Sequence, residues 1–572
     1  MPSVEKDHEL CVLANKLRDL DVSSRDARNV RNRIKQVLHS HRRSLADLNV
    51  DPFALESSHW DLQSLPVSGA LMNLEALEEV LVIPDAHLEL LLQPILSCVR
   101  DLWPSIISWL DFLHPMHRVG TPRMQLAPLE TITRLISSLF TLKGSLPDLF
   151  ADTPRIYRLI FDLWVRFDIY CDMPRMNDTL HACVGRLGYA VLGYAIWQPD
   201  KEMDGGATME MDKRTEDSVA LHALLGVVRY RRRFLYRQIV RQSHILLRLS
   251  VSGNAVRNDI ILQNQLAILG VLSERLLSIP HYPREVVSRL VRIIQELLTV
   301  TGGPAIAHTA TSALHSMWRT AGDRCSLVWS LRAGVLPAIL TLREIEPIRH
   351  SANSLGLISL EAMSVDVLRA LDSSGRALDI AGGVLGLDEK PLERKIQAEI
   401  NQNLRDRIAL IRSLYKKTCA YRLCISSVEQ ARATLRRCSC QTVCYCCKQC
   451  QRRDWPTHRR ACRENQVIAT HGDIAPLDAH FLMLCGRARL RSLAPDILAE
   501  ISRLPVAAPD VPPCFHVVLD FGVIPPAMPE VSVMGASDTQ EAMVWVTSFL
   551  HLPTRDAAVR AMYIPVRMLA AF

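Results

Sequence analysis

Nine of the chain's sixteen cysteines lie in one short stretch, which begins at Cys419 and ends at Cys462. Seven of them and one histidine form four close pairs: Cys419 with Cys424, Cys438 with Cys440, Cys446 with Cys450, and His458 with Cys462. Zinc prefers four soft ligands in a tetrahedron, and a chain supplies them most easily as close pairs. The four pairs therefore predict two zinc sites. Because no coordination position is left for water, the sites are structural rather than catalytic.

The spacing within each pair predicts the local backbone structure that carries it. The third and fourth pairs have i, i+4 spacing, which places both side chains on one face of a helical turn. The first pair suits a turn. Pro456 suits the first turn of a new helix that carries His458 and Cys462, with Asp454 as its cap. The pair Cys438 and Cys440 is tighter than the usual knuckle, in which two residues separate the ligands.

The stretch from Cys419 to Cys462 resembles a MYND-type zinc finger. The resemblance is carried by Tyr445-Cys446-x3-Cys450-Gln451, then Asp454-Trp455, then His458-x3-Cys462. It covers less than a tenth of the chain. The overall layout, a mostly helical chain with one such finger, is similar to that of uncharacterised fungal MYND-type proteins.

The resemblance implies that the pairs are interleaved between two zinc ions. The first ion would be held by Cys419, Cys424, Cys446 and Cys450, and the second by Cys438, Cys440, His458 and Cys462. The family usually has two residues between its third and fourth ligands, whereas this chain has only Ser439. Cys440 is the favoured fourth ligand, and Cys444 and Cys447 are the alternatives.

The resemblance also implies a docking role. Similar fingers use a glutamine at the position of Gln451 to bind short Pro-containing motifs, although a solvated helix glutamine is an equally good interpretation. Tyr445 and Trp455 are expected to form the small core between the zinc sites, with a partner contact as the alternative for Trp455.

The finger segment is basic, with nine Lys and Arg against two Asp and Glu. These cations would stabilise zinc-bound thiolates and so favour metal capture near neutral pH. A surface of this charge could also contact nucleic acid. Another basic run, Arg229–Gln242, has apolar residues at helical spacing and is expected to be the charged side of an amphipathic helix.

The rest of the chain must position the finger, and it is predicted to be mostly helical. In Leu129–Leu142 and Arg284–Val300 apolar residues recur at i, i+3, i+4 and i+7, which buries one stripe of a helix. Segments of this kind follow one another to about residue 415. They predict a long helical array, either irregular or an α-solenoid of armadillo-like type.

The predicted organisation has five parts. A helical region (1–197) is followed by an exposed polar loop (198–217), the continuation of the helical array (218–415), the zinc finger (419–462) and a small α+β cap (463–572). In the cap, Pro476–Leu504 is expected to form one helix, and the runs CFHVVLDFGVIP and AMVWVTSFL are strand-like.

Composition favours an intracellular protein in the nucleus or the cytoplasm. The first twenty residues are charged throughout, and the most apolar stretch of the chain is interrupted by Pro, Asp, Glu, His and Arg. We therefore expect no membrane segment, and a reducing compartment in which clustered cysteines bind metal. The formal net charge of +7 permits an acidic partner without requiring one.

No catalytic signature stands out. The sequence has no GxGxxG, P-loop, HExxH or GxSxG motif, and it lacks the Asn-His-x-Cys run and the Gly-x-Gly loop of SET-type lysine methyltransferases. We therefore predict a non-enzymatic, zinc-binding interaction scaffold that docks short Pro-containing motifs of partner proteins. The alternatives are a nucleic-acid-associated regulator and, less favoured, a SET-type methyltransferase.

Overall fold

The computed structural model divides the chain into two compact units, Met1–Ile279 and Pro280–Phe572. The structure describes residues 8–55, 65–117, 126–141, 146–170, 185, 187–188, 191, 219–252, 255–345, 349–373, 402, 404–412, 418–424, 435–440, 443–464, 468–471, 476–505, 513–520, 529–536, 543–552 and 555–565. The predicted loop 198–217 lies outside these residues. The five-part division of the chain remains a prediction.

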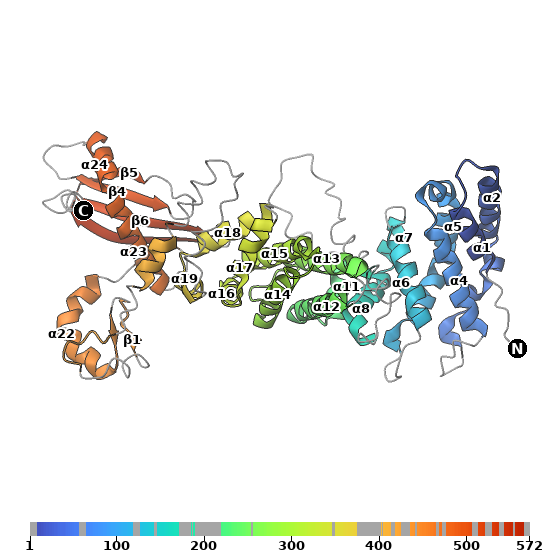
Figure 1. The fold of residues 1–572 in the computed structure, drawn as a ribbon, viewed down its shortest axis with the longest axis horizontal. Coiled ribbons are helices and arrows are strands. Elements are labelled where there is room, and N and C mark those ends of the chain that lie inside the picture. The colour runs from blue at the N-terminus through green and yellow to red at the C-terminus, as the bar shows by residue number, and fades with distance from the viewer. Residues whose placement is uncertain are drawn as a thin grey trace. The chain divides into compact units, whose positions relative to one another are not determined.

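The first unit is entirely helical where it is described (Figure 1). Its α-helices are α1 (Glu9–Arg18), α2 (Arg25–His39), α3 (His41–Ser44), α4 (Leu65–Leu81), α5 (Asp85–Phe112), α6 (Leu126–Thr141), α7 (Pro147–Asp152), α8 (Arg155–Tyr170), α11 (Val219–Val227), α12 (Arg232–Ser252) and α13 (Ala255–Val271). Short single-turn elements are η1 (Ala46–Asn49), η2 (Pro52–Ala54), η3 (Pro115–His117) and the π-helical η6 (Leu272–Leu276).

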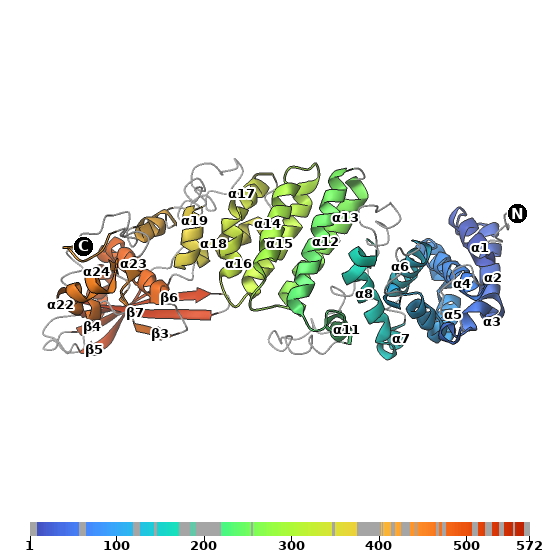
Figure 2. The same cartoon turned by 90° about the horizontal axis from the view of Figure 1, so that it is seen from below.

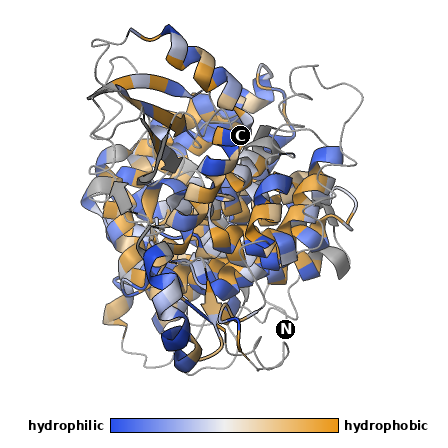
Figure 3. Cartoon of the chain, turned by 90° about the vertical axis from the view of Figure 1, so that its left-hand side faces the viewer, coloured by the Kyte–Doolittle hydropathy of each residue, from blue (hydrophilic) through white to orange (hydrophobic). Residues whose placement is uncertain are grey.

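The helical periodicity predicted from the sequence is confirmed in α6. Its stripe of Ile132, Leu135, Ile136 and Leu139 is fully buried at 0% exposure. Apolar and polar residues, orange and blue in Figure 3, alternate along the helices. Burial of these stripes is the main source of stability of such helices, because short helices are marginal in water on their own.

Helix α5 is, within the described part of the chain, the one helix long and apolar enough to cross a membrane, and α16 (Cys325–Arg332) with α17 (Val335–Ile345) would make a bent second span. Half of the apolar window of α5 is buried. Leu91, Ile95 and Val99 have no exposed surface. The apolar residues of α5 therefore pack as a helix of the protein core.

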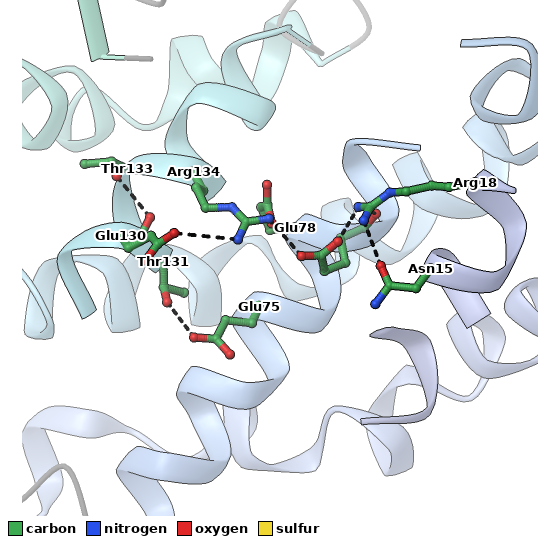
Figure 4. Close-up of polar contacts among 9 residues, drawn as sticks. Asn15, Arg18, Glu75, Glu78, Glu130, Thr131, Thr133 and Arg134 are labelled. Carbon is green, nitrogen blue, oxygen red and sulfur yellow. Dashed lines mark hydrogen bonds and ion pairs between the residues drawn. The ribbon is translucent and has the colours of Figure 1, made fainter. Parts of the chain in front are cut away.

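A partly buried polar network joins α1, α4 and α6 (Figure 4). Arg134 of α6 pairs with Glu78 at 2.6 Å and Glu79 at 2.8 Å, and Arg18 of α1 also pairs with Glu79. Burial alone would raise the pKa of Glu79, but hydrogen bonds from the two arginines outweigh it and hold that pKa below its ordinary value. The network fixes how the three helices pack, since each charge needs its partner once it is partly buried.

The Arg-rich run Arg229–Gln242 begins with a tight turn and continues as α12. Arg229 and Tyr230 adopt positive φ angles of 51° and 58° and connect α11 to α12. Leu235 and Tyr236 of α12 are fully buried, and the Tyr236 hydroxyl donates to the Leu277 carbonyl at 3.0 Å. The run therefore has one face in the core, as expected of an amphipathic helix.

The second unit begins with six helices. They are α14 (Arg284–Leu297), α15 (Gly303–Thr320), α16, α17, α18 (Arg349–Glu361) and α19 (Val365–Ser373). Helices α14, α15 and α17 stand side by side (Figure 2). The predicted stripe of α14 is confirmed, with Leu290, Val291 and Ile294 at 0% exposure.

The C-terminal part of this unit is a five-stranded mixed sheet with two helices. The strands are β3 (Ile468–His471), β4 (Pro513–Asp520), β5 (Glu530–Ala536), β6 (Met543–Leu552) and β7 (Arg555–Pro565), and the helices are α23 (Pro476–Ser492) and α24 (Ala494–Arg503). The strand order is β3-β7-β6-β4-β5, and only the β4–β6 pair is parallel. Helix α23 packs against β6 and β7, and α24 packs against β5.

The mostly helical fold with a small α+β region at its C-terminal end is as predicted, including the strands β4 and β6. The prediction of a single helix over Pro476–Leu504 is wrong. The helix is interrupted at Leu493, where φ is −107° and ψ is 6°. Pro495 lies in the first turn of α24 and has no N–H to continue the hydrogen-bond ladder of α23.

Gly486 sets how closely α23 approaches the sheet. A Cβ at this position would lie 2.5 Å from Oγ of Ser548 on β6, whose side chain is buried. We expect Gly486→Ala to destabilise the second unit by about 2 kcal/mol, since a packed interface must shift to admit the methyl group. Thermal unfolding of the full chain measures the loss.

The control for this variant is Gly356→Ala on α18, where the new Cβ meets nothing within 4 Å. That substitution should leave stability unchanged or raise it by up to about 1 kcal/mol, because alanine favours helix over glycine. Equal effects of the two variants would contradict the close approach at Gly486.

Candidate metal centre

The metal-ligand cluster is built on a short hairpin followed by a helix. Strand β1 (Arg436–Arg437) pairs antiparallel with β2 (Cys444–Tyr445). The Cys438 N–H donates to the Val443 carbonyl at 2.9 Å, so the tight pair of cysteines lies where the hairpin turns. The turn that carries the first pair is tied to the hairpin because the Ala420 N–H donates to the Cys444 carbonyl at 2.8 Å.

The structure brings the eight predicted ligands together as two groups of four. One group contains Cys419, Cys424, Cys446 and Cys450, and the other contains Cys438, Cys440, His458 and Cys462. In each group the ligand atoms all lie within 4.8 Å of one another. These are the interleaved sets that the resemblance implies.

The distances between ligand atoms fit tetrahedral zinc. A site with Zn–S bonds of about 2.3 Å has S···S edges of about 3.8 Å. In the first group, Cys446 Sγ lies 3.5 Å from Cys424 Sγ and 3.5 Å from Cys450 Sγ. In the second, Cys438 and Cys462 are 3.7 Å apart at their sulfurs, and Cys440 Sγ is 3.3 Å from His458 Nε2. The residues therefore fit one ion in each group.

One helix serves both groups. Helix α22 (Lys448–Glu464) carries Cys450 of the first group and His458 and Cys462 of the second. Cys446 precedes the helix, so the expectation that the third pair shares a helical turn is wrong for its first member.

Residues 423–462 match the family model of the MYND finger. This chain carries a MYND finger. The finger is a zinc-binding module, and its two Cys/His groups correspond to two zinc ions. The match begins after Cys419, which the structure nevertheless places in the first group. A search of the curated proteins finds no match to this chain.

The two sites of the MYND finger differ in burial. All four residues of the second group are buried, whereas those of the first are partly exposed. Cys438, Cys440 and Cys462 share a small core with Tyr445, against which Val443 and Cys450 pack. The tight spacing around Ser439 is therefore accommodated at the buried site, with Cys440 at 3% exposure.

The expectation of a new helix starting at Pro456 is wrong. Pro456 lies inside the continuous helix α22, and Asp454 accepts a hydrogen bond from the Tyr445 hydroxyl at 2.7 Å. Burial raises the pKa of Tyr445, and the hydrogen bond to Asp454 raises it further, so the phenol keeps its proton and donates. Proline disfavours a helix interior. Here ligand residues on both sides of Pro456 and the Tyr445–Asp454 bond hold the helix together.

Tyr445 is part of the finger core as predicted, but Trp455 is not. The Tyr445 side chain is 2% exposed, whereas Trp455 is 42% exposed. The Trp455 ring meets the His458 ring edge-on at a centroid distance of 6.3 Å. Gln451, one turn earlier on α22, is partly exposed. The sequence identifies Trp455 and Gln451, but it does not predict which side chains of α22 face solvent.

The two alternative cysteines lie outside both groups. Cys444 is buried on β2, and burial raises the pKa of its thiol. Cys447 is exposed, and its sulfur accepts a hydrogen bond from the Cys450 N–H at 3.4 Å. The geometry therefore brings Cys440, rather than either alternative, to the second group.

Proposed function

We propose that the MYND finger docks short Pro-containing segments of partner proteins and that the chain is a non-enzymatic interaction scaffold. MYND fingers are in general protein-interaction modules, which supports a protein partner. The more specific part of the proposal, that the bound segments contain proline, rests on Trp455.

Trp455 supports the proposal because it is an exposed aromatic ring on a fixed support. Its edge-on contact with His458 ties the ring to the buried zinc group, so the ring has little freedom to lose on binding. Aromatic rings that are held in place are the usual platform for proline. Gln451 lies one helical turn away, where its amide could bond the backbone of a bound segment.

One observation argues against the nucleic-acid alternative, and another against the enzyme alternative. The basic run Arg229–Gln242 has Leu235 and Tyr236 in the core, so its arginines are accounted for as the outer side of a helix. The eight ligand residues fill both tetrahedra and leave no open position at which a zinc-bound water could react. A structural role of the metal is the simpler proposal.

The test is peptide binding by a Trp455→Ala variant. We expect the affinity of the full chain for Pro-containing peptides to fall at least about tenfold, since a central aromatic anchor typically carries most of such an interface. Fluorescence anisotropy with labelled peptides selected on the parent chain measures the change. Zinc content should stay at two ions, because Trp455 is not a ligand.

Thr457→Ala is the matched control. Thr457 is exposed on α22 but two positions from Trp455, and therefore on the other side of the helix. Its loss should leave peptide affinity unchanged. If both variants bind peptides as the parent does, Trp455 is not the docking surface.

A further inference from the structure

A row of cations follows one face of α22 and passes through Trp455. Lys448, Arg452, Trp455 and Arg459 are separated by four, three and four residues, a spacing that keeps them within one narrow stripe of a helix. All four side chains are exposed. We call Lys448, Arg452 and Arg459 the basic stripe.

The basic stripe is not neutralised by acids of the described residues. In that part of the chain no ion pair and no side-chain hydrogen bond is found for Lys448, Arg452 or Arg459. Asp454, the acidic residue nearest to them on the helix, accepts the Tyr445 hydroxyl instead. Three exposed cations therefore lie in a row with an exposed tryptophan, and within the described residues no carboxylate pairs with them.

We propose that the segment bound by the MYND finger is acidic, with Asp or Glu residues on both sides of its proline that pair with the basic stripe. The inference rests on the proposed docking function and adds the charge of the partner. Arginine can take a carboxylate in two parallel hydrogen bonds, which gives direction as well as attraction. Pairing on both sides of the ring fixes which proline reaches Trp455.

The dimensions suit a short peptide. From Lys448 to Arg459 the helix rises by about 16 Å, which an extended peptide spans in about five residues. Arg452 and Arg459 lie one turn on either side of Trp455. The acidic residues are therefore expected within about three positions of the proline.

The same stripe is a poor fit to nucleic acid. Nucleic-acid binders commonly neutralise about six to ten phosphates, and the stripe offers three cations. Only one aromatic ring lies in the row, whereas single strands are bound by successive stacked bases. A carboxylate-bearing peptide uses all three cations and the ring together.

The experiment compares matched peptides on the full chain. Pro-containing peptides carry Glu on both sides of the proline, Gln at the same positions, or Lys at the same positions, and anisotropy measures their affinity. We expect the Glu peptides to bind about tenfold more tightly than the Gln peptides at low salt, and the difference to shrink as salt rises. The Lys peptides should bind more weakly than the Gln peptides.

The stripe itself is tested with Arg452→Gln/Arg459→Gln. This variant should lose the preference for Glu and keep its affinity for the Gln peptides. The control removes the same charge elsewhere on the finger, as Arg422→Gln/Arg453→Gln. Both of these residues are exposed, and Arg453 lies on another face of α22. The control should keep the preference for Glu.

The outcomes separate the two proposals. Equal affinity for Glu and Gln peptides overturns the acidic partner and leaves the docking function standing. No binding of any peptide overturns both. Tighter binding of a single-stranded oligonucleotide than of the Glu peptides at the same salt, lost in Arg452→Gln/Arg459→Gln, would assign the stripe to nucleic acid and overturn the acidic peptide.

Discussion

The Cys440→Ser variant should contain one zinc ion per chain where the parent contains two. Cys440 Sγ lies 3.3 Å from His458 Nε2 in the buried group, and a serine hydroxyl is a poor replacement for a thiolate. A structural zinc site contributes on the order of 10 kcal/mol of local folding free energy, so the loss should unfold the C-terminal half of α22. Metal analysis gives the zinc count, and hydrogen exchange of Pro456–Glu464 reports the local unfolding.

Cys447→Ser is the control, because this exposed cysteine belongs to neither group. It should retain two zinc ions and the parent's exchange pattern. Circular dichroism of both variants should keep its helical signal, since most helices lie outside the finger. Two zinc ions retained in Cys440→Ser would show that another cysteine completes the second site.

The Asp478→Ala variant should lose about 3 kcal/mol of stability and expose the start of α19. Asp478 lies on α23, yet its carboxylate accepts the Val365 N–H at 2.9 Å and so caps α19 from a distant part of the chain. It also pairs at 2.9 Å with Arg324, which pairs at 2.6 Å with Glu361. The three side chains are only 13–15% exposed, and removing Asp478 leaves the Val365 N–H without its acceptor and Arg324 with one carboxylate instead of two.

Hydrogen exchange of α19 and the thermal midpoint measure this effect. Asp478→Asn should lie between the parent and the alanine variant, because the amide oxygen can still accept the Val365 N–H but carries no charge for Arg324. Glu500→Ala is the control, since its pair with Arg503 is about half exposed or more on both sides and should contribute less than about 1 kcal/mol. A result for Asp478→Ala equal to that control would exclude the capping role.

The sequence predicts local features of this molecule well. The stripe of α14 could be read from its period, because a surface helix must bury one face. The four ligand pairs could be read from their spacing, and the structure gathers them into the two groups that the resemblance implies. That Cys440 binds zinc stays a prediction until the metal is counted.

Features that depend on distant residues could not be predicted in the same way. Strand β3 pairs with β7, which follows it by more than eighty residues, and the parallel pairing of β4 with β6 skips over β5. No local pattern specifies such partners, since register and order follow from which faces are buried together. The cap of α19 by Asp478 is of the same kind.

Near the metal centre, restraints from elsewhere override local preference. Pro456 on its own favours the start of a helix, yet the ligands on either side keep α22 continuous. Trp455 is expected in the core by residue type, and the orientation that the ligands impose on α22 leaves its ring exposed. Both errors concern residues for which the geometry of the metal ligands outweighs residue type.

Because α22 supplies ligands to both groups, the two metals cannot load independently. Filling the first site through Cys450 orders the start of the helix, so the free-energy cost of nucleating α22 is no longer part of binding the second ion. The first ion should therefore raise the affinity for the second. During a metal titration the half-loaded chain should therefore be less populated than it would be if the two sites were independent.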